Sequence, residues 1–276
     1  MPDEAHGGFI GEIDAQGAVV PGASKGIILN SRLLWFFSEM ARHTNDERLA
    51  DLSTRAYRYF VDHFDDPEHG GAVWELDPTG TVLTDRKQIY ALCFCIYALC
   101  ARFDATGDTA ALDLAKAYVG HIETHAHDRT RGGYVEAFTR DWQVIGDFRE
   151  GIAELDSPKT MNTHLHLLEA YTAVHRSAPD EQSAALLHNA IDLLRNRVLD
   201  RDTGHLRLFF DFEWRSQSPI VSYGHDIEAS WLLWEAAEAL GDDALLRDIK
   251  PDVLLLATCC LERGIGRSGQ LCNEFN

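Results

Sequence analysis

The chain has 276 residues, a formal net charge of −19 and an apolar content of 45%, which is enough to fill a sizeable core. Its acidic residues are spread over the whole length, which indicates a solvated surface and argues against nucleic acid as a partner. No stretch approaches about 18 unbroken apolar residues and the N-terminus has no basic segment followed by an apolar one, so we expect a cytoplasmic protein with no membrane partner.

Glycine-led segments recur along the chain and divide it into repeats. They occupy residues 6–20, 69–83, 131–145, 203–217 and 264–276. Most continue as alternating or aromatic residues around a turn, which is the pattern of a small β-hairpin. Successive segments begin about 62–72 residues apart, a period typical of a helical repeat protein.

Two helical patterns lie between successive hairpins, the first apolar and aromatic, the second more polar and Ala-rich. The first-type helices are predicted at 26–43, 86–104, 158–176 and 224–240, and their partners at 46–63, 109–126, 181–198 and 242–262. This order predicts an all-α protein with an inner and an outer layer, either an open solenoid or a closed α/α toroid. A toroid of six such pairs needs about 380 residues, so we expect one incomplete ring domain over residues 1–276.

We expect the first-type helices to form the inner layer and call them the inner helices. Hydrogen-bonding side chains are concentrated in their opening turns. They are Asn30 and Arg32, then Arg86, Lys87, Gln88 and Tyr90, then Asn162, His164 and His166, and last His225, Asp226 and Glu228. Because each opening follows a hairpin, we expect these polar ends to share one mouth of the ring. Arg32 lies among apolar neighbours, so we expect it to be buried against an anion, a carboxylate or a sugar oxygen.

Spacing singles out two histidines. His166 with Glu169, and His225 with Glu228, are i,i+3 pairs that share a helix face. A carboxylate beside an imidazole fixes its tautomer and raises its basicity, which suits a general base near neutral pH. On its hairpin, Trp74 is a candidate for stacking on a sugar ring, although an ordinary packing role is the more common one for such a residue.

Metal binding is the main alternative chemistry. Two His-x-x-Glu pairs resemble a di-metal bundle, but that arrangement has the order Glu-x-x-His and needs two further glutamates. The other two inner helices offer Arg32 and Lys87 instead, which argues against a metal and for an anionic intermediate. The six cysteines form no CxxC pair and are predicted to be reduced core residues. We therefore expect no metal and no cofactor.

Four segments carry a family resemblance: KGIILNSRLLWFFS, DRKQIYALCFCIYAL, MNTHLHLLEAY and YGHDIEASWLLWEAAE. In their order and spacing they resemble the N-acylglucosamine 2-epimerase family, and within it the cellobiose 2-epimerases. The resemblance implies an (α/α)6 barrel and reversible epimerisation at C2 of a reducing sugar, without metal or redox cofactor. It also implies that His225 is one of two histidines that exchange the C2 proton, with Glu228 supporting and orienting it.

The other matching residues take roles from the same resemblance. Arg32 and Tyr90 would bind around the reacting C1–C2 end, where Arg32 stabilises an enediolate, and Asn162 and His166 would contribute to ring opening and oxygen binding. In the family the partner histidine lies on a late helix beyond the segment resembling GRSGQLCNEFN. We therefore expect a fragment of a longer protein; a truncated relative without catalysis and a ring completed by another subunit are the alternatives.

The predicted function is that of a sugar 2-epimerase acting on the reducing-end glucose of cellobiose-type disaccharides, or on a related N-acylglucosamine or mannose sugar. One alternative is an aldose–ketose isomerase, because the same enediolate can be reprotonated at C1. The other is a non-catalytic helical protein that binds a sugar or acts as a scaffold. The predicted partner is a small sugar, and the open ends of an incomplete ring would expose apolar surface that favours self-association.

Overall fold

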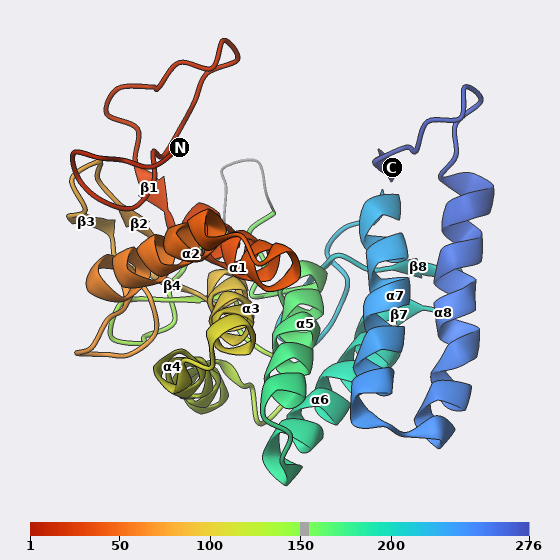
Figure 1. Cartoon of the computed structure of the whole chain (residues 1–276). Coiled ribbons are helices and arrows are strands. Elements are labelled where there is room, and N and C mark those ends of the chain that lie inside the picture. The colour runs from red at the N-terminus through yellow and green to blue at the C-terminus, as the bar shows by residue number, and fades with distance from the viewer. Residues whose placement is uncertain (150–154, 276) are drawn as a thin grey trace. The chain divides into compact units, whose positions relative to one another are not determined.

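The computed structural model describes residues 1–149 and 155–275, and these contain eight α-helices in four pairs (Figure 1). The pairs are α1 (Ile27–Thr44) with α2 (Glu47–Tyr59), α3 (Ile89–Thr106) with α4 (Thr109–His121), α5 (Met161–Ser177) with α6 (Glu181–Leu193), and α7 (Tyr223–Leu240) with α8 (Asp243–Arg263). The prediction of four helix pairs with short strands between them is confirmed.

The tight turn within each pair follows from its capping residues. The N-caps of the four second helices are aspartates whose carboxylates accept backbone N–H groups, namely Asp46, Asp108, Asp180 and Asp242. Such a cap contributes about 1 kcal/mol. The first helices of three pairs end at a residue in the left-handed conformation, which is Asn45, Gly107 or Gly241.

The second helices of the first three pairs do not end as α-helices. Each continues into one π-helical turn: η1 (Phe60–Phe64), η2 (Ile122–Ala126) and η3 (Leu194–Val198). The first and last side chains of every such turn are buried. The wider turn therefore keeps two apolar contacts in the core while the chain turns towards the next hairpin.

Short antiparallel strands connect each pair to the next hairpin. The strand before each inner helix pairs with a strand of the next hairpin along the chain. The pairs are β1 (Lys25–Gly26) with β2 (Glu75–Leu76), β4 (Lys87–Gln88) with β5 (Ala137–Phe138), β6 (Lys159–Thr160) with β9 (Phe209–Phe210), and β10 (Val221–Ser222) with β11 (Glu274–Phe275). In addition, β2 pairs with β3 (Val82–Thr84), and β7 (Leu199–Asp200) pairs with β8 (His205–Leu206). Backbone pairing thus holds a hairpin against the start of every inner helix.

The described residues form two compact units, one of residues 1–126 with 137–146 and one of residues 127–136 with those from 147 onward. In the first unit α1 packs on α3, and in the second α5 packs on α7. Helix α3 is long and apolar enough to cross a membrane by length and composition alone, but 61% of it is buried inside the protein. Burial of that extent is what a core helix shows.

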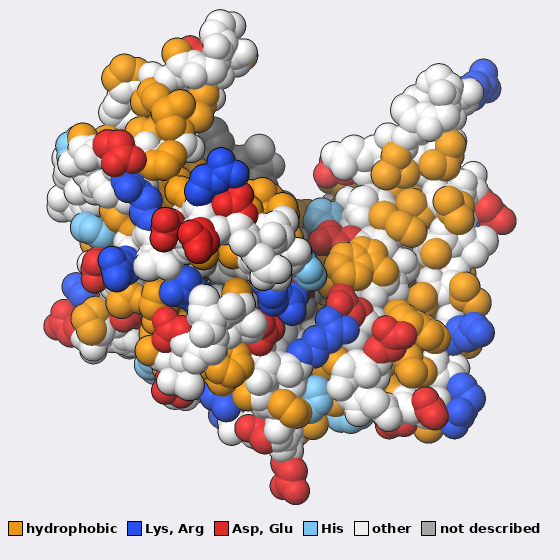
Figure 2. Space-filling view, viewed as in Figure 1, with side chains coloured by type: hydrophobic (Ala, Val, Ile, Leu, Met, Phe, Trp, Pro, Cys, Tyr) orange, Lys and Arg blue, Asp and Glu red, His pale blue; other side chains and the backbone are white. Residues whose placement is uncertain are grey.

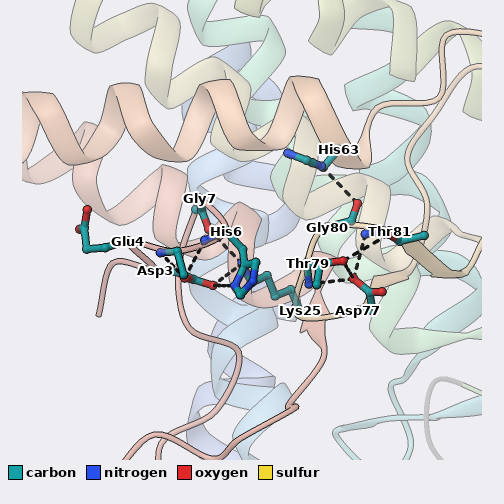
Figure 3. A network of polar contacts seen from close by, with 12 residues as sticks. Asp3, Glu4, His6, Gly7, Lys25, His63, Asp77, Thr79, Gly80 and Thr81 are labelled. Carbon is teal, nitrogen blue, oxygen red and sulfur yellow. Dashed lines mark hydrogen bonds and ion pairs between the residues drawn. The ribbon is translucent and has the colours of Figure 1, made fainter.

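A buried lysine precedes each of the first three inner helices and pairs with an aspartate. The pairs are Lys25 with Asp3 at 2.8 Å, Lys87 with Asp66 at 2.7 Å and Lys159 with Asp128 at 2.9 Å. Each aspartate lies four residues before the first glycine of its hairpin. Figure 3 shows the first pair, in which the Lys25 ammonium also donates to the carbonyl of Gly7 at 2.9 Å.

These pairs correct the expectation for Lys87. It was predicted to present its charge at the mouth of the ring, but its side chain is 0% exposed and donates to the equally buried Asp66. The lysine belongs to the strand before the helix, where its side chain reaches back to the hairpin loop. Lys87 therefore holds the hairpin in place and is not a substrate-binding cation.

Candidate active site

A pocket of about 510 Å³ opens in the second unit. Its walls are the start of α5, strand β9 and the loop that follows it, the first turn of α7 and strand β11. The lining residues are Leu155, Thr160, Met161, Asn162, Leu208, Phe209, Gln217, Ser218, Ile220, His225 and Glu274. Two of the predicted site residues, Asn162 and His225, thus line the same pocket.

His225 is the titratable group on the helical wall of the pocket. Its Nδ1 atom lies 2.8 Å from the hydroxyl oxygen of Ser222. Burial lowers the pKa of His225 below its ordinary value, against the opposing effect of the Glu228 carboxylate, and the nearby His166 lowers that pKa further. A neutral imidazole is therefore favoured at neutral pH, which is the form that accepts a proton.

The hydrogen-bond partner of His225 differs from the predicted one. The i,i+3 spacing predicted that Glu228 would support and orient the ring, but the Nδ1 atom is hydrogen-bonded to Ser222. Ser222 ends β10 immediately before the helix, so its side chain reaches the first-turn imidazole from the N-terminal side. Glu228 acts on His225 through its charge, which raises the pKa of the imidazole.

His166 carries the carboxylate partner that its spacing predicted. Its Nδ1 atom donates to Glu169 at 2.9 Å, and the residue is 7% exposed. One turn earlier on α5, Asn162 lines the pocket with a buried side-chain oxygen that has no hydrogen-bond partner among the described residues. A buried amide oxygen without a donor costs free energy, so a hydroxyl-bearing ligand would relieve it.

Two other polar residues of the inner helices are structural. Asp226 is fully buried and holds α7 against β8, where its carboxylate accepts from His205 Nδ1 at 2.7 Å and from the Leu206 N–H at 2.9 Å. His164 donates from Nδ1 to the Thr160 carbonyl at 2.6 Å and accepts the Tyr134 N–H at Nε2. Burial lowers the pKa of His164 to about 4, so it stays neutral.

The remaining predicted residues belong to the first unit. Arg32 is exposed, which corrects the expectation of a buried arginine, and its guanidinium lies 4.4 Å from the centre of the Phe94 ring. The rings of Tyr90 and Phe94 are edge to face at 5.0 Å. Asn30 is one of the buried polar residues of α1 and donates to the Gly26 carbonyl. Trp74 is half-buried immediately before strand β2, where its carbonyl accepts the Ile27 N–H at the start of α1.

Sequence reasoning missed several residues of the pocket. Phe209 and Gln217 come from the fourth hairpin, Ser218 follows it directly, and Glu274 comes from the fifth hairpin. Strand pairing places Glu274 opposite Ser222, next to the first turn of α7. The hairpin repeat is the sequence signal that could have predicted these residues. In each repeat a hairpin strand pairs with the strand before an inner helix, which places hairpin residues beside the start of that helix.

Within residues 1–149 and 155–275, no group of three or more His, Cys, Asp or Glu side chains is placed to hold a metal ion. The described cysteines are free, and all but Cys272 are buried.

Residues 8–266 match the family model of N-acylglucosamine 2-epimerase (GlcNAc 2-epimerase). The chain belongs to this family. It is 46% identical over 276 residues to a cellobiose 2-epimerase of Bacteroides fragilis and covers 70% of that protein. A solved sugar epimerase from a ruminal bacterium superposes with a TM-score of 0.95 at 34% identity, over all of this chain and 70% of the other.

A more distant relative is the D-mannose isomerase of Marinomonas mediterranea, 23% identical over 167 residues, which are 60% of this chain and 39% of that protein. The predicted family and the α/α toroid fold class of its members are confirmed by these comparisons.

Proposed function

We propose that this protein is a sugar 2-epimerase that acts on the reducing-end glucose of a cellobiose-type disaccharide. Family membership supports epimerisation, and the similarity to the cellobiose 2-epimerase of Bacteroides fragilis supports the disaccharide. The observation that carries the proposal is the position of His225, a neutral imidazole in the wall of a pocket that also contains the unpartnered amide oxygen of Asn162.

The chemistry begins with the open-chain sugar, whose C1 aldehyde makes the hydrogen on C2 acidic. The imidazole of His225 accepts that hydrogen as a proton, and the electron pair of the C–H bond moves towards C1 to give an enediolate. Return of a proton to the opposite face of C2 gives the epimer, so inversion requires a second acid on that face. His225 alone can remove and return the proton on one face.

The other site residues have supporting roles in this proposal. His166, whose Nδ1 is held by Glu169, assists ring opening, and Asn162 accepts a hydrogen bond from a sugar hydroxyl. For Arg32 and Tyr90, which belong to the first unit, binding around the reacting carbons and stabilising the enediolate stay predictions from the family resemblance. Stacking of Trp74, also in the first unit, on a sugar ring likewise stays a prediction.

The direct test is incubation of the protein with cellobiose, followed by separation of the products. The proposal predicts a disaccharide with mannose at its reducing end, absent from a His225→Gln sample. Monomeric N-acetylglucosamine and mannose, tested in parallel, measure how far the second sugar contributes to recognition. If cellobiose is bound but is neither epimerised nor labelled at C2, the protein is a sugar-binding module.

An aldose–ketose isomerase is the second candidate, because the chain is also similar to a D-mannose isomerase. Both reactions pass through the same enediolate and differ in whether the proton returns to C2 or to C1. A ketose product without the C2 epimer would favour the isomerase and overturn the epimerase proposal.

A further inference from the structure

Ser222 occupies a position where a serine usually caps a helix, yet it does not cap one. It is the residue before α7, is 2% exposed and has an extended backbone. A serine at this position normally accepts a backbone N–H of the first turn. The Ser222 hydroxyl makes no such bond and is hydrogen-bonded instead to His225 Nδ1 at 2.8 Å.

Of the described residues that precede the four inner helices, only Thr160 makes a side-chain cap, since Gly26 and Gln88 before α1 and α3 make none. Thr160 precedes α5, and its hydroxyl accepts the Thr163 N–H at 3.1 Å while donating to the Glu136 carboxylate at 2.6 Å. At the start of α7 this capping hydrogen bond, which contributes about 1 kcal/mol, is absent. The Ser222 hydroxyl is hydrogen-bonded to the His225 imidazole instead. Ser222 is thus a hydroxyl residue that could cap α7 and instead contacts an imidazole in the pocket wall.

A hydroxyl is a particular kind of partner for an imidazole. The Glu169 carboxylate accepts the Nδ1 hydrogen of His166 and carries a full negative charge, whereas a neutral hydroxyl can accept the Nδ1 hydrogen of His225 without adding one. Proton transfer at Nε2 needs two states of His225, neutral and protonated, and both carry a hydrogen on Nδ1. The Ser222 hydroxyl oxygen can therefore accept the same Nδ1 hydrogen in both states without reorienting.

We propose that Ser222 is a positioning residue that holds His225 in the tautomer with its hydrogen on Nδ1, leaving Nε2 as the proton-accepting nitrogen. The role rests on the proposed function, since Nε2 is the nitrogen that would exchange the C2 proton. The free imidazole side chain prefers its hydrogen on Nε2, so the proposed tautomer requires a partner.

The test is nitrogen NMR of the 276-residue protein with labelled histidines at pH 7.5. The His225 signals are assigned by their loss in His225→Gln. We expect a protonated Nδ1 and a bare Nε2 in the unchanged protein, a shift towards the other tautomer in Ser222→Ala, and recovery in Ser222→Thr, which keeps the hydroxyl. His205, whose Nδ1 is held by Asp226, should be unchanged in every variant and reports on folding.

A hydrogen on Nε2 in the unchanged protein, or the same tautomer in Ser222→Ala, would overturn the proposal. The tautomer is measured without any turnover, so the two proposals can fail separately. Failure of the epimerase proposal would appear as an inactive protein whose Nδ1–H signal is intact. Where turnover is observed, Ser222→Ala should lower kcat by about tenfold or more with a smaller change in KM, and Ser222→Thr should restore it.

Discussion

Nδ1 of His166 lies 2.9 Å from a carboxylate oxygen of Glu169, whereas Nδ1 of His225 lies 2.8 Å from the hydroxyl of Ser222. The two imidazoles are close enough for His166 to lower the pKa of His225. One histidine is therefore supported by a charge and its neighbour by a neutral group. This difference suits an assignment in which His225 is the neutral base and His166 assists from the side.

Replacement of His225 should remove the chemistry and leave the fold intact. We expect His225→Gln to lower turnover by about 100-fold or more, since a positioned general base contributes about 10²–10⁴-fold. Its melting temperature should stay within a few degrees of the unchanged protein, because the ring is only partly buried. His188→Gln, at an exposed position of α6, is the matched control and should change neither quantity.

The buried pair of Lys87 and Asp66 should matter for stability. We expect Lys87→Met to lower the free energy of unfolding by about 3–5 kcal/mol, because it leaves a buried carboxylate without its ammonium partner. Arg140, which also contacts Asp66 at 2.8 Å, would reduce this loss. Denaturant unfolding measures it, with the exposed Lys116→Met as control. A Lys87→Met variant of unchanged stability with impaired sugar binding would contradict this structural role and support a substrate-binding role for Lys87.

His164 predicts a pH dependence of stability. Its folded pKa is lowered to about 4 from an ordinary 6.5, so the unfolded chain takes up a proton first as the pH falls. The stabilisation is complete above pH 6.5 and is lost as the pH falls towards 4, by about 3 kcal/mol. Protonation would also break the hydrogen bond from Tyr134 N–H to Nε2. Unfolding at pH 7 and pH 4.5 should show a smaller difference in His164→Gln, and an equal difference would contradict the assignment.

Apolar side chains on α8 predict self-association. Leu254 and Leu261 lie two turns apart on one helix face and are 53% and 65% exposed. Figure 2 shows apolar side chains gathered over the surface of α7 and α8. We expect concentration-dependent association in sedimentation experiments, weakened in the double variant Leu254→Ser, Leu261→Ser. Unchanged association in that variant would exclude this face.

The repeat made most of the fold predictable from the sequence. Hairpin glycines and Asp caps such as Asp108 recur at nearly constant intervals, so the helix ends follow from local rules. The burial of Arg32 was wrongly predicted, because neighbours in sequence lie about 100° apart on a helix and do not share its face. The Lys87–Asp66 pair and the Ser222–His225 bond join a strand to another element, and the helical pattern alone does not show which way these side chains turn.

The most direct test of the account is deuterium exchange at C2 of cellobiose, followed by proton NMR in heavy water. If His225 removes and returns the C2 hydrogen, the C2 proton signal of the reducing-end sugar disappears with time in the unchanged protein and persists in His225→Gln. This exchange is expected even where no mannose end is formed, because it needs a base on one face only. An undiminished C2 signal in the presence of bound, unchanged cellobiose would contradict the central claim.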